Sequence, residues 1–411
     1  MPRLAGSFCT ASRSAQRCTR NKHYYKTMKL PFGYLFLVFM WLSCGNSQIQ
    51  KEVYLSISPL VKSDEANNAE VINVLEEFLK TKDNSLTENP YWVKEDFKKY
   101  GYPYRELYRI EDSRLGQDYY RPSLMEIINI NADTRLLKIA FIGLDSHSGE
   151  RVVRCIYNIL ATQRNSRWML QRVTDFKSKD WHTLKVESIT YVLPSNVLPN
   201  KDEIEKQRLD IKRLCRFFEV SPIPITYYSC NDPIQLYELK GFDYTHDMYI
   251  SKSGGLAEFG NTVLSANHSE FYTHEIVHIY TQEAYPFKNM FLDEGLATYV
   301  GGSGTKSYAW HRDRLKSYIK DYDLDFSEYI EPYSNQYIND VTPVPYIIGG
   351  LICERTIRLL GKDKLFQAIA SRNETWAILT ELGLNKGNIS VELKKELARA
   401  IRPFNQESQK I

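Results

Sequence analysis

The sequence predicts an α+β protein with two folded domains. Its 411 residues exceed the usual size of one domain, and its 43% hydrophobic and 25% charged residues are ordinary for globular proteins. Helical periodicity followed by β-branched strands fills the first part of the chain, and a mostly helical stretch fills the last part. Helices and short strands separated along the chain in this way are typical of the α+β class.

The first 47 residues are of a different kind. They contain seven basic side chains and no acidic one, and residues 32–42 form an apolar run that follows Lys29. A basic start, an apolar core and the small residues from Ser43 to Ser47 are the three parts of a secretory signal peptide. The run is shorter than the roughly 20 residues of a membrane-spanning helix. We therefore predict a signal peptide at residues 28–47, an unstructured or spurious extension at residues 1–27, and an exported protein.

Cys44 leaves two outcomes open for the exported form. Cleavage after Ser47 would release a soluble periplasmic or secreted protein. The segment Trp41-Leu-Ser-Cys44 is also similar to a bacterial lipobox, although Trp41 stands where a small aliphatic residue is usual. A lipid on Cys44 would then anchor the protein to the cell envelope, and it would be the protein's only contact with a membrane.

The remainder of the chain has 46 basic and 50 acidic residues and no basic stripe, which excludes nucleic acid as a partner. Its four cysteines have irregular spacing and no CxxC pair. One or two disulfides and buried free thiols both remain open, and none of the four is expected to bind a metal. They are Cys155, Cys215, Cys230 and Cys353.

Residues 48–180 predict a small α+β domain. Apolar residues recur every three or four positions over residues 69–81, which predicts an amphipathic helix, and a second helical stretch covers residues 92–100. Strands are expected at residues 136–143, 151–161 and 166–173, separated by turn residues. This order is similar to that of the cone-shaped cystatin-like folds, in which a curved sheet wraps around a helix. Such folds bind many kinds of partner, so the pattern implies no activity.

Residues 184–405 predict a second domain, with a small sheet lobe joined to a helical lobe. Strands are expected at residues 186–193, 223–228 and 262–265, with a helix at residues 202–218. From residue 270 to residue 400 the pattern is mostly helical.

One of these helices contains His274-Glu275-Ile-Val-His278, which is the candidate metal-binding motif. Residues four apart lie on the same face of a helix, so the two imidazoles converge on one point, as two ligands of a metal do. Glu275 is then close enough to activate a water molecule without being a ligand. Two histidines on a helix surface are the simpler alternative, and the downstream sequence argues against it.

Glu294 follows His278 by sixteen residues, within Phe291-Leu-Asp-Glu-Gly295. Catalytic zinc sites commonly take two histidines and one glutamate, which leaves a fourth position for water. A third segment, Val344-Pro-Tyr346-Ile-Ile-Gly349, begins another apolar helix.

These three segments, in this order, resemble the catalytic domain of the gluzincin (peptidase MA-like) zinc metallopeptidases, in particular the aminopeptidase N and leukotriene hydrolase enzymes. The resemblance covers about residues 184–402. It implies Zn²⁺ as the cofactor, with His274, His278 and Glu294 as its ligands and Glu275 as the general base. It also implies that the hydroxyl of Tyr346 stabilises the oxyanion.

Three departures limit the resemblance. The spacing between His278 and Glu294 is shorter than in the aminopeptidases. Their G-x-M-E-N signature, whose glutamate holds the substrate's free amine, is present only as the loose echo Gly255-Leu-Ala-Glu258, so Glu258 is either an amine anchor or an ordinary carboxylate. Thr298 stands where some relatives place an aspartate beside a ligand histidine. The choice between endopeptidase and aminopeptidase therefore remains open.

The sequence thus predicts an exported zinc metallopeptidase that hydrolyses a peptide or protein substrate with zinc-activated water. The alternative is a zinc-containing binding or assembly protein of the cell envelope without catalytic activity. Nothing in the sequence indicates the oligomeric state.

Overall fold

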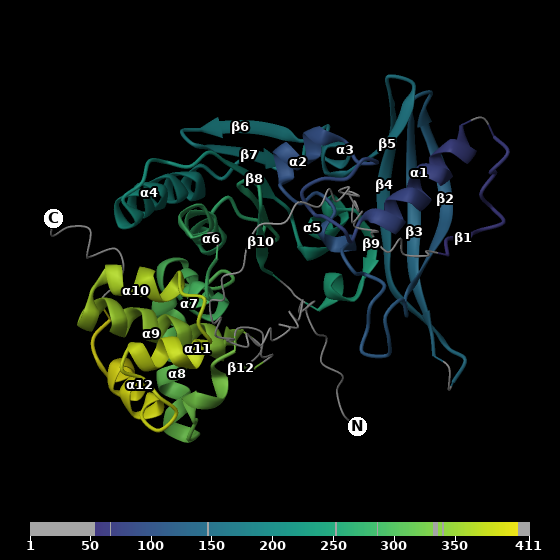
Figure 1. The fold of residues 1–411 in the computed structure, drawn as a ribbon. Coiled ribbons are helices and arrows are strands. Elements are labelled where there is room, and N and C mark those ends of the chain that lie inside the picture. The colour runs from purple at the N-terminus through teal and green to yellow at the C-terminus, as the bar shows by residue number, and fades with distance from the viewer. Residues whose placement is uncertain are drawn as a thin grey trace, which may run out of the picture.

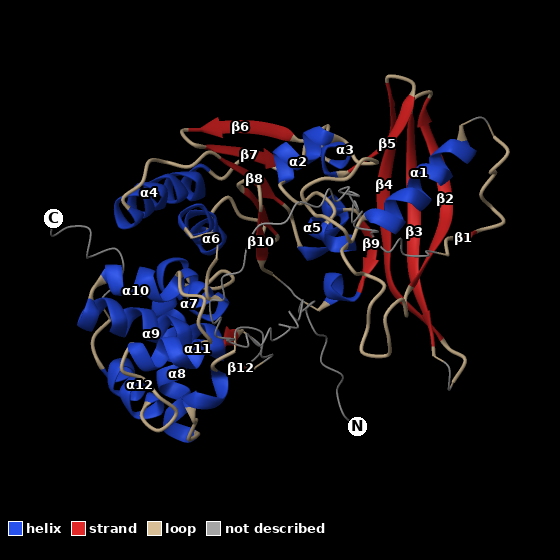
Figure 2. Ribbon diagram, viewed as in Figure 1, coloured by secondary structure: helices blue, strands red, loops and turns tan. Residues whose placement is uncertain are grey.

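A computed structural model describes residues 54–401, apart from residues 66, 146–147, 251–252, 286, 332–335 and 339–340. The expected extension, the signal peptide and Cys44 lie outside the described residues. The chain forms an N-terminal sheet with one long helix on it, a second smaller sheet, and a lobe of helices (Figures 1 and 2). The α+β class predicted from the sequence is confirmed.

The N-terminal sheet has six strands in the order β1-β2-β3-β4-β5, with β9 also paired to β4. The strands are β1 (Ser56–Ile57), β2 (Arg121–Asn131), β3 (Thr134–Leu144), β4 (Arg151–Arg164), β5 (Arg167–Gln171) and β9 (Phe242–Thr245). Helix α1 (Asn68–Thr81) buries Val71, Leu75 and Phe78 against it, as the helical periodicity predicts. Three strands of this sheet were not expected from the sequence, β1, β2 and β9, and β9 joins the sheet from about 80 residues downstream of β4.

Short helices and turns connect the strands. They are α2 (Lys94–Tyr100), a 3₁₀ turn η1 (Arg105–Leu107), α3 (Thr174–Lys177), α5 (Pro233–Lys240) and η2 (His246–Tyr249). Of these, α2, α3 and α5 lie between the two sheets (Figure 1).

Helix α2 contains a buried carboxylate that makes the stability of this region depend on pH. Asp96 accepts hydrogen bonds from the Trp92 indole at 2.9 Å and from the Arg172 backbone at 2.7 Å. Burial nevertheless raises the pKa of Asp96 to about 6. An unfolded aspartate has a pKa of about 3.9, so the folded state holds its proton more tightly, and stability falls as the pH rises from about 4 to about 6.

Replacing Asp96 by Asn should remove this pH dependence, because the amide keeps an oxygen for both donors and carries no charge. We expect the difference in free energy of unfolding between Asp96→Asn and wild type to shift in favour of the variant by about 1 kcal/mol between pH 5 and pH 7.5. Urea unfolding at the two pH values measures it. An advantage that is constant with pH would contradict the assignment.

The second sheet has the order β10-β11-β8-β7-β6. Its strands are β6 (His182–Val186), β7 (Ile189–Leu193), β8 (Ile225–Ser229), β10 (Gly255–Glu258) and β11 (Thr262–Ser265). Strand β7 lies within the strand predicted at residues 186–193, but that prediction begins too early and misses β6. The two strands form a hairpin, and Glu187 at its turn has a φ of 48°. Helix α4 (Lys201–Phe218) begins at Asn200, whose side chain accepts from the backbone N–H groups of Asp202 and Glu203.

The helical lobe is built around α9. Its elements are α6 (Thr273–Ala284), α7 (Met290–Gly301), α8 (Tyr308–Asp321), η3 (Phe326–Tyr329), β12 (Tyr337–Ile338), β13 (Thr342–Pro343), α9 (Val344–Leu360), α10 (Lys362–Ile369), α11 (Thr375–Glu381) and α12 (Ile389–Ala398). Residues of α9 from Val344 to Thr356 are almost all buried. One apolar core runs from the second sheet through α6 and α7 into this lobe.

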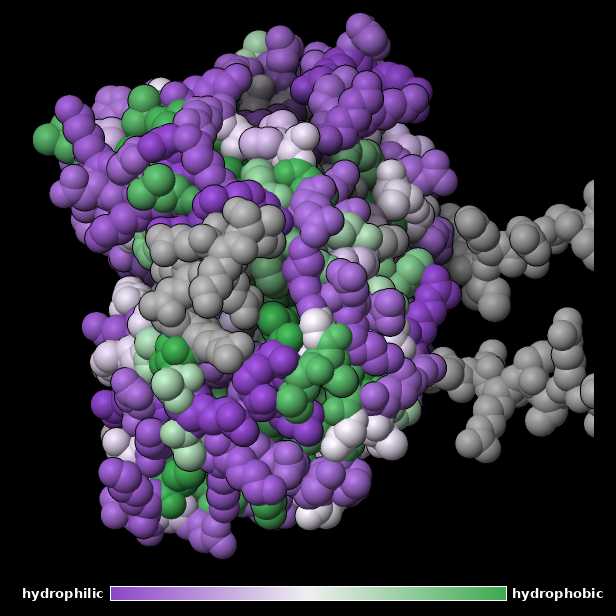
Figure 3. Space-filling view, turned by 90° about the vertical axis from the view of Figure 1, so that its left-hand side faces the viewer, coloured by the Kyte–Doolittle hydropathy of each residue, from purple (hydrophilic) through white to green (hydrophobic). Residues whose placement is uncertain are grey.

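The face of the molecule that carries α4 and the helical lobe is mainly polar. On this face, hydrophilic residues dominate and hydrophobic residues lie in separate small patches (Figure 3). Within the described part of the chain, no helix has the length and apolar character needed to cross a membrane. No disulfide joins Cys155, Cys215, Cys230 and Cys353 to one another, so of the two alternatives for these cysteines the structure supports thiols over disulfides.

Candidate metal centre

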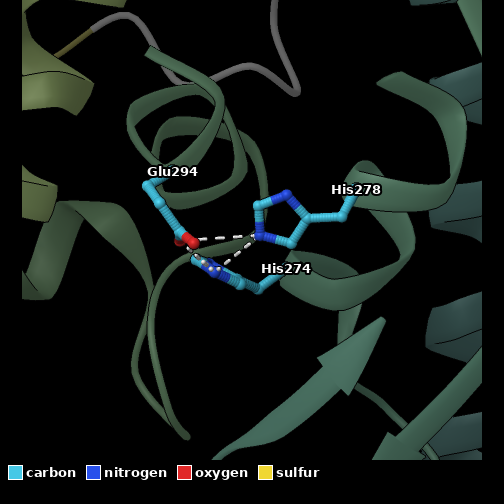
Figure 4. Close-up of side chains that lie close together, drawn as sticks. All are labelled: His274, His278 and Glu294. Carbon is cyan, nitrogen blue, oxygen red and sulfur yellow. Dashed lines mark hydrogen bonds and ion pairs between the residues drawn. The ribbon is translucent and has the colours of Figure 1, made fainter. Parts of the chain in front are cut away.

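Three side chains from two neighbouring helices meet at one point (Figure 4). His274 and His278 lie one turn apart on α6, and Glu294 projects toward them from α7. The His274 Nε2 atom lies 3.4 Å from the His278 Nε2 atom and 3.3 Å from the Glu294 Oε2 atom. The third side of the triangle, from His278 Nε2 to Glu294 Oε2, is 3.5 Å. The three residues predicted as metal ligands are thus brought together.

The other ring nitrogen of each histidine is held by an acceptor. His274 Nδ1 lies 2.6 Å from the carbonyl oxygen of Gly302, which can only accept, so this nitrogen carries the proton. His278 Nδ1 lies 2.8 Å from the Asp293 carboxylate. Both Nε2 atoms therefore face the centre of the triangle, beside a carboxylate oxygen, and each offers a lone pair there when its ring is neutral.

This set of donors fits a zinc ion. Ligands about 2.0–2.1 Å from a tetrahedral zinc ion lie about 3.3–3.4 Å from one another, close to the three distances of this triangle. Two lone pairs and a carboxylate that face one point repel each other unless a cation lies among them. Burial lowers the pKa of His278, but the carboxylates of Asp293 and Glu294 outweigh burial and raise this pKa well above its ordinary value. A metal ion would take the place of the proton on the Nε2 atom of His278.

Asp293 is the residue that sequence reasoning missed. It is fully buried, and besides His278 it accepts from the Thr281 hydroxyl at 2.7 Å and pairs with the Lys288 ammonium at 2.7 Å. A carboxylate in this position fixes the ring of a ligand histidine and raises its basicity. The sequence feature that could have indicated this role is the position of Asp293 directly before Glu294, the third predicted ligand. Thr298 does not take this role: its hydroxyl has no hydrogen-bond partner among the described residues.

Replacing Asp293 by Ala should weaken zinc binding by about 10- to 100-fold, because His278 loses the acceptor that orients it. Competition with a chromogenic chelator measures the affinity. Asp293→Asn is the matched control, since its amide oxygen still accepts from His278, and it should lose less. An unchanged affinity in Asp293→Ala would show that His278 is held by its packing alone.

Glu275 lies beside the three predicted ligands and at the edge of the second sheet. It is nearly buried, and the backbone of Ala257 in β10 is hydrogen-bonded to its carboxylate. Burial raises the pKa of Glu275, and the neighbouring His274 and His278 only partly offset this effect. A carboxylate with a raised pKa is better suited to take up a proton near neutral pH.

Tyr346 stands in the first turn of α9 beside the ligands. Its ring lies nearly parallel to that of His274, with 6.0 Å between the ring centroids and an angle of 13°. The position of Tyr346 follows from the close crossing of the α7 and α9 backbones. A Cβ atom added to Gly349 would come within 2.8 Å of the Gly295 Cα atom. Helices α7 and α9 thus approach each other closely at Gly295, directly after Glu294, and Gly349, three residues after Tyr346. Two of the sequence segments thus form one packing contact.

Two further polar residues near α6 have plain structural roles. His268, six residues before His274, is exposed, and its Nδ1 atom lies 2.9 Å from the Asn231 side chain. Glu258 is not free to hold a substrate amine, because both of its oxygens are paired with Arg172 and Lys240. The amine-anchor interpretation of Glu258 is therefore wrong.

Comparison of the sequence with protein-family models gives no match, and comparison with curated proteins gives none either. The function must accordingly be argued from the site itself.

Proposed function

We propose that this chain is a zinc-dependent peptide hydrolase, exported by the predicted signal peptide. The observation that carries the proposal is the triangle of three electron-pair donors with Glu275 beside it. A helix that offers two imidazoles to a metal and a carboxylate to the adjacent water position has the parts needed for metal-assisted hydrolysis.

The open edge of β10 supplies a place for an extended substrate. The carbonyl of Gly254 accepts from the backbone of Ala266 in the strand next to it, and pairing alternates along an antiparallel ladder. Leu256 and Glu258 therefore face β11, whereas the backbone groups of Gly255 and the carbonyl of Ala257 face outward, and the Ala257 N–H is bonded to Glu275. A peptide that adds to this edge is held by main-chain hydrogen bonds beside Glu275.

Each residue then has a definite task. Zinc, when bound by His274, His278 and Glu294, supplies Lewis-acid chemistry that polarises a carbonyl and lowers the pKa of water to about 7. Glu275 takes the proton from the attacking water and passes it to the leaving amine. Tyr346 donates a hydrogen bond to the oxyanion that forms at the scissile carbonyl.

A profile of cleaved peptides from a proteome-derived library tests the proposal directly. We expect cleavage by the zinc-loaded protein, loss of cleavage after chelation, and recovery when zinc is restored. Stoichiometric zinc binding without cleavage of any peptide would instead favour the non-catalytic binding or assembly protein.

A further inference from the structure

Four charged side chains form a buried cluster where residues 54–180, which we call the N-terminal unit, meet β10. The Arg172 guanidinium binds both oxygens of Glu258, at 2.8 Å and 3.2 Å. Lys240 reaches the same carboxylate at 2.6 Å and Glu106 at 2.7 Å. The four side chains are only 2 to 14% exposed, and their charges sum to zero. We call them the charge quartet.

The charge quartet adjoins the candidate site. Glu258 is the last residue of β10, directly after Ala257, whose backbone is hydrogen-bonded to Glu275. A peptide added antiparallel to β10 has its amino-terminal side toward Glu258. Phe259, the next residue, is fixed against the N-terminal unit, with its ring centroid 4.1 Å from that of Tyr102. The end of the edge strand is thus firmly held next to where a substrate's first residues would lie.

An enzyme that recognises the amino terminus of its substrate needs a carboxylate oxygen that is available to an ammonium group. Glu258 has the right position on the edge strand but no such oxygen, because Arg172 occupies both and Lys240 shares one. An incoming ammonium would also add a positive charge to a cluster that is already neutral. It would have to displace a buried cation to gain a partner.

We propose that Arg172 and Lys240 determine the specificity of this site: by saturating Glu258 they make it indifferent to a substrate's free α-amino group. The substrate class is then the interior of an extended polypeptide, bound through its backbone, and the cleavage is that of an endopeptidase. This inference rests on the proposed peptide-binding function, and it assigns the N-terminal unit a part in substrate selection.

The test compares two forms of one short extended peptide, labelled at its carboxyl end, with a free and with an acetylated amino terminus. Binding to the zinc-loaded Glu275→Gln protein is measured by fluorescence anisotropy at about pH 6.5, where an α-amino group with a pKa of about 7.7–8.0 is charged. We expect the two affinities to agree within about threefold. A preference of about tenfold or more for the free amine overturns the inference, and so does the absence of binding by both peptides.

Hydrolysis by the wild-type protein is followed in parallel and separates the two proposals. Equal binding without hydrolysis overturns the proposed catalytic function and leaves the inference standing. Hydrolysis only of the peptide with a free amino terminus supports the proposed catalytic function and overturns the inference.

A matched pair of variants tests the role of the charge quartet itself. Lys240→Met leaves a net negative charge at Glu258 and Glu106, and it should create a preference of about tenfold for the free-amine peptide. Adding Glu106→Gln restores the charge balance and should abolish that preference. Thermal unfolding checks that both variants are folded. A folded Lys240→Met protein without any preference would overturn the assignment. If this variant does not fold, the comparison of the two peptides on the Glu275→Gln protein with an intact charge quartet decides the question.

Discussion

Glu275→Gln should lower kcat for peptide hydrolysis by about 10²–10⁴-fold while zinc stays bound. Glutamine has almost the same shape as glutamate, but it cannot take up the proton of the attacking water. The three metal ligands are separate side chains, and their positions depend on Gly302 and Asp293 rather than on Glu275. The variant should therefore retain stoichiometric zinc and an unchanged melting temperature.

The control for this variant is Glu283→Gln, the same change on the same helix at an exposed position. It should leave kcat, KM and zinc content unchanged. Full zinc-dependent activity in Glu275→Gln would remove the general base from the proposal. Loss of zinc in Glu275→Gln would mean that Glu275 supports the metal site instead.

The parts of this site that could be predicted from the sequence are those that depend on short-range geometry. Residues four apart share a helix face whatever the surrounding fold, so His274 and His278 were certain to face the same way if the helix formed. Glu294 and Tyr346 required a resemblance to known enzymes, because only tertiary packing brings α7 and α9 to α6. The contact between Gly295 and Gly349 is that packing, and it gives each glycine a physical reason.

The sequence-based predictions failed mainly where the structure depends on interactions between distant segments. The strand predicted at residues 186–193 ran through the turn before β7 because this turn, at Glu187, contains no glycine or proline, and β6 was not predicted. Strand β9 escaped notice because it completes a sheet whose other strands lie far upstream. The role of Glu258 depends on Arg172, which is 86 residues away in the chain, so no local pattern could show that its carboxylate is already paired.

The hydroxyl of Tyr346 can be tested separately from its ring. Tyr346→Phe keeps the nearly parallel contact with His274, which involves the ring alone, and removes only the hydrogen-bond donor. If the hydroxyl stabilises the oxyanion, kcat should fall by about 10²–10³-fold with KM nearly unchanged, because the bond forms only in the transition state. Steady-state kinetics on a cleaved peptide measures both constants.

Tyr346→Ala is the companion variant, because it removes the ring as well. Since the ring packs beside a metal ligand, this variant should lose zinc affinity in addition to kcat, whereas Tyr346→Phe should bind zinc as tightly as wild type. If Tyr346→Phe keeps full kcat and only Tyr346→Ala is impaired, the residue acts by packing against His274. The oxyanion would then depend on zinc alone for its stabilisation, and the resemblance to the aminopeptidases would not extend to this step.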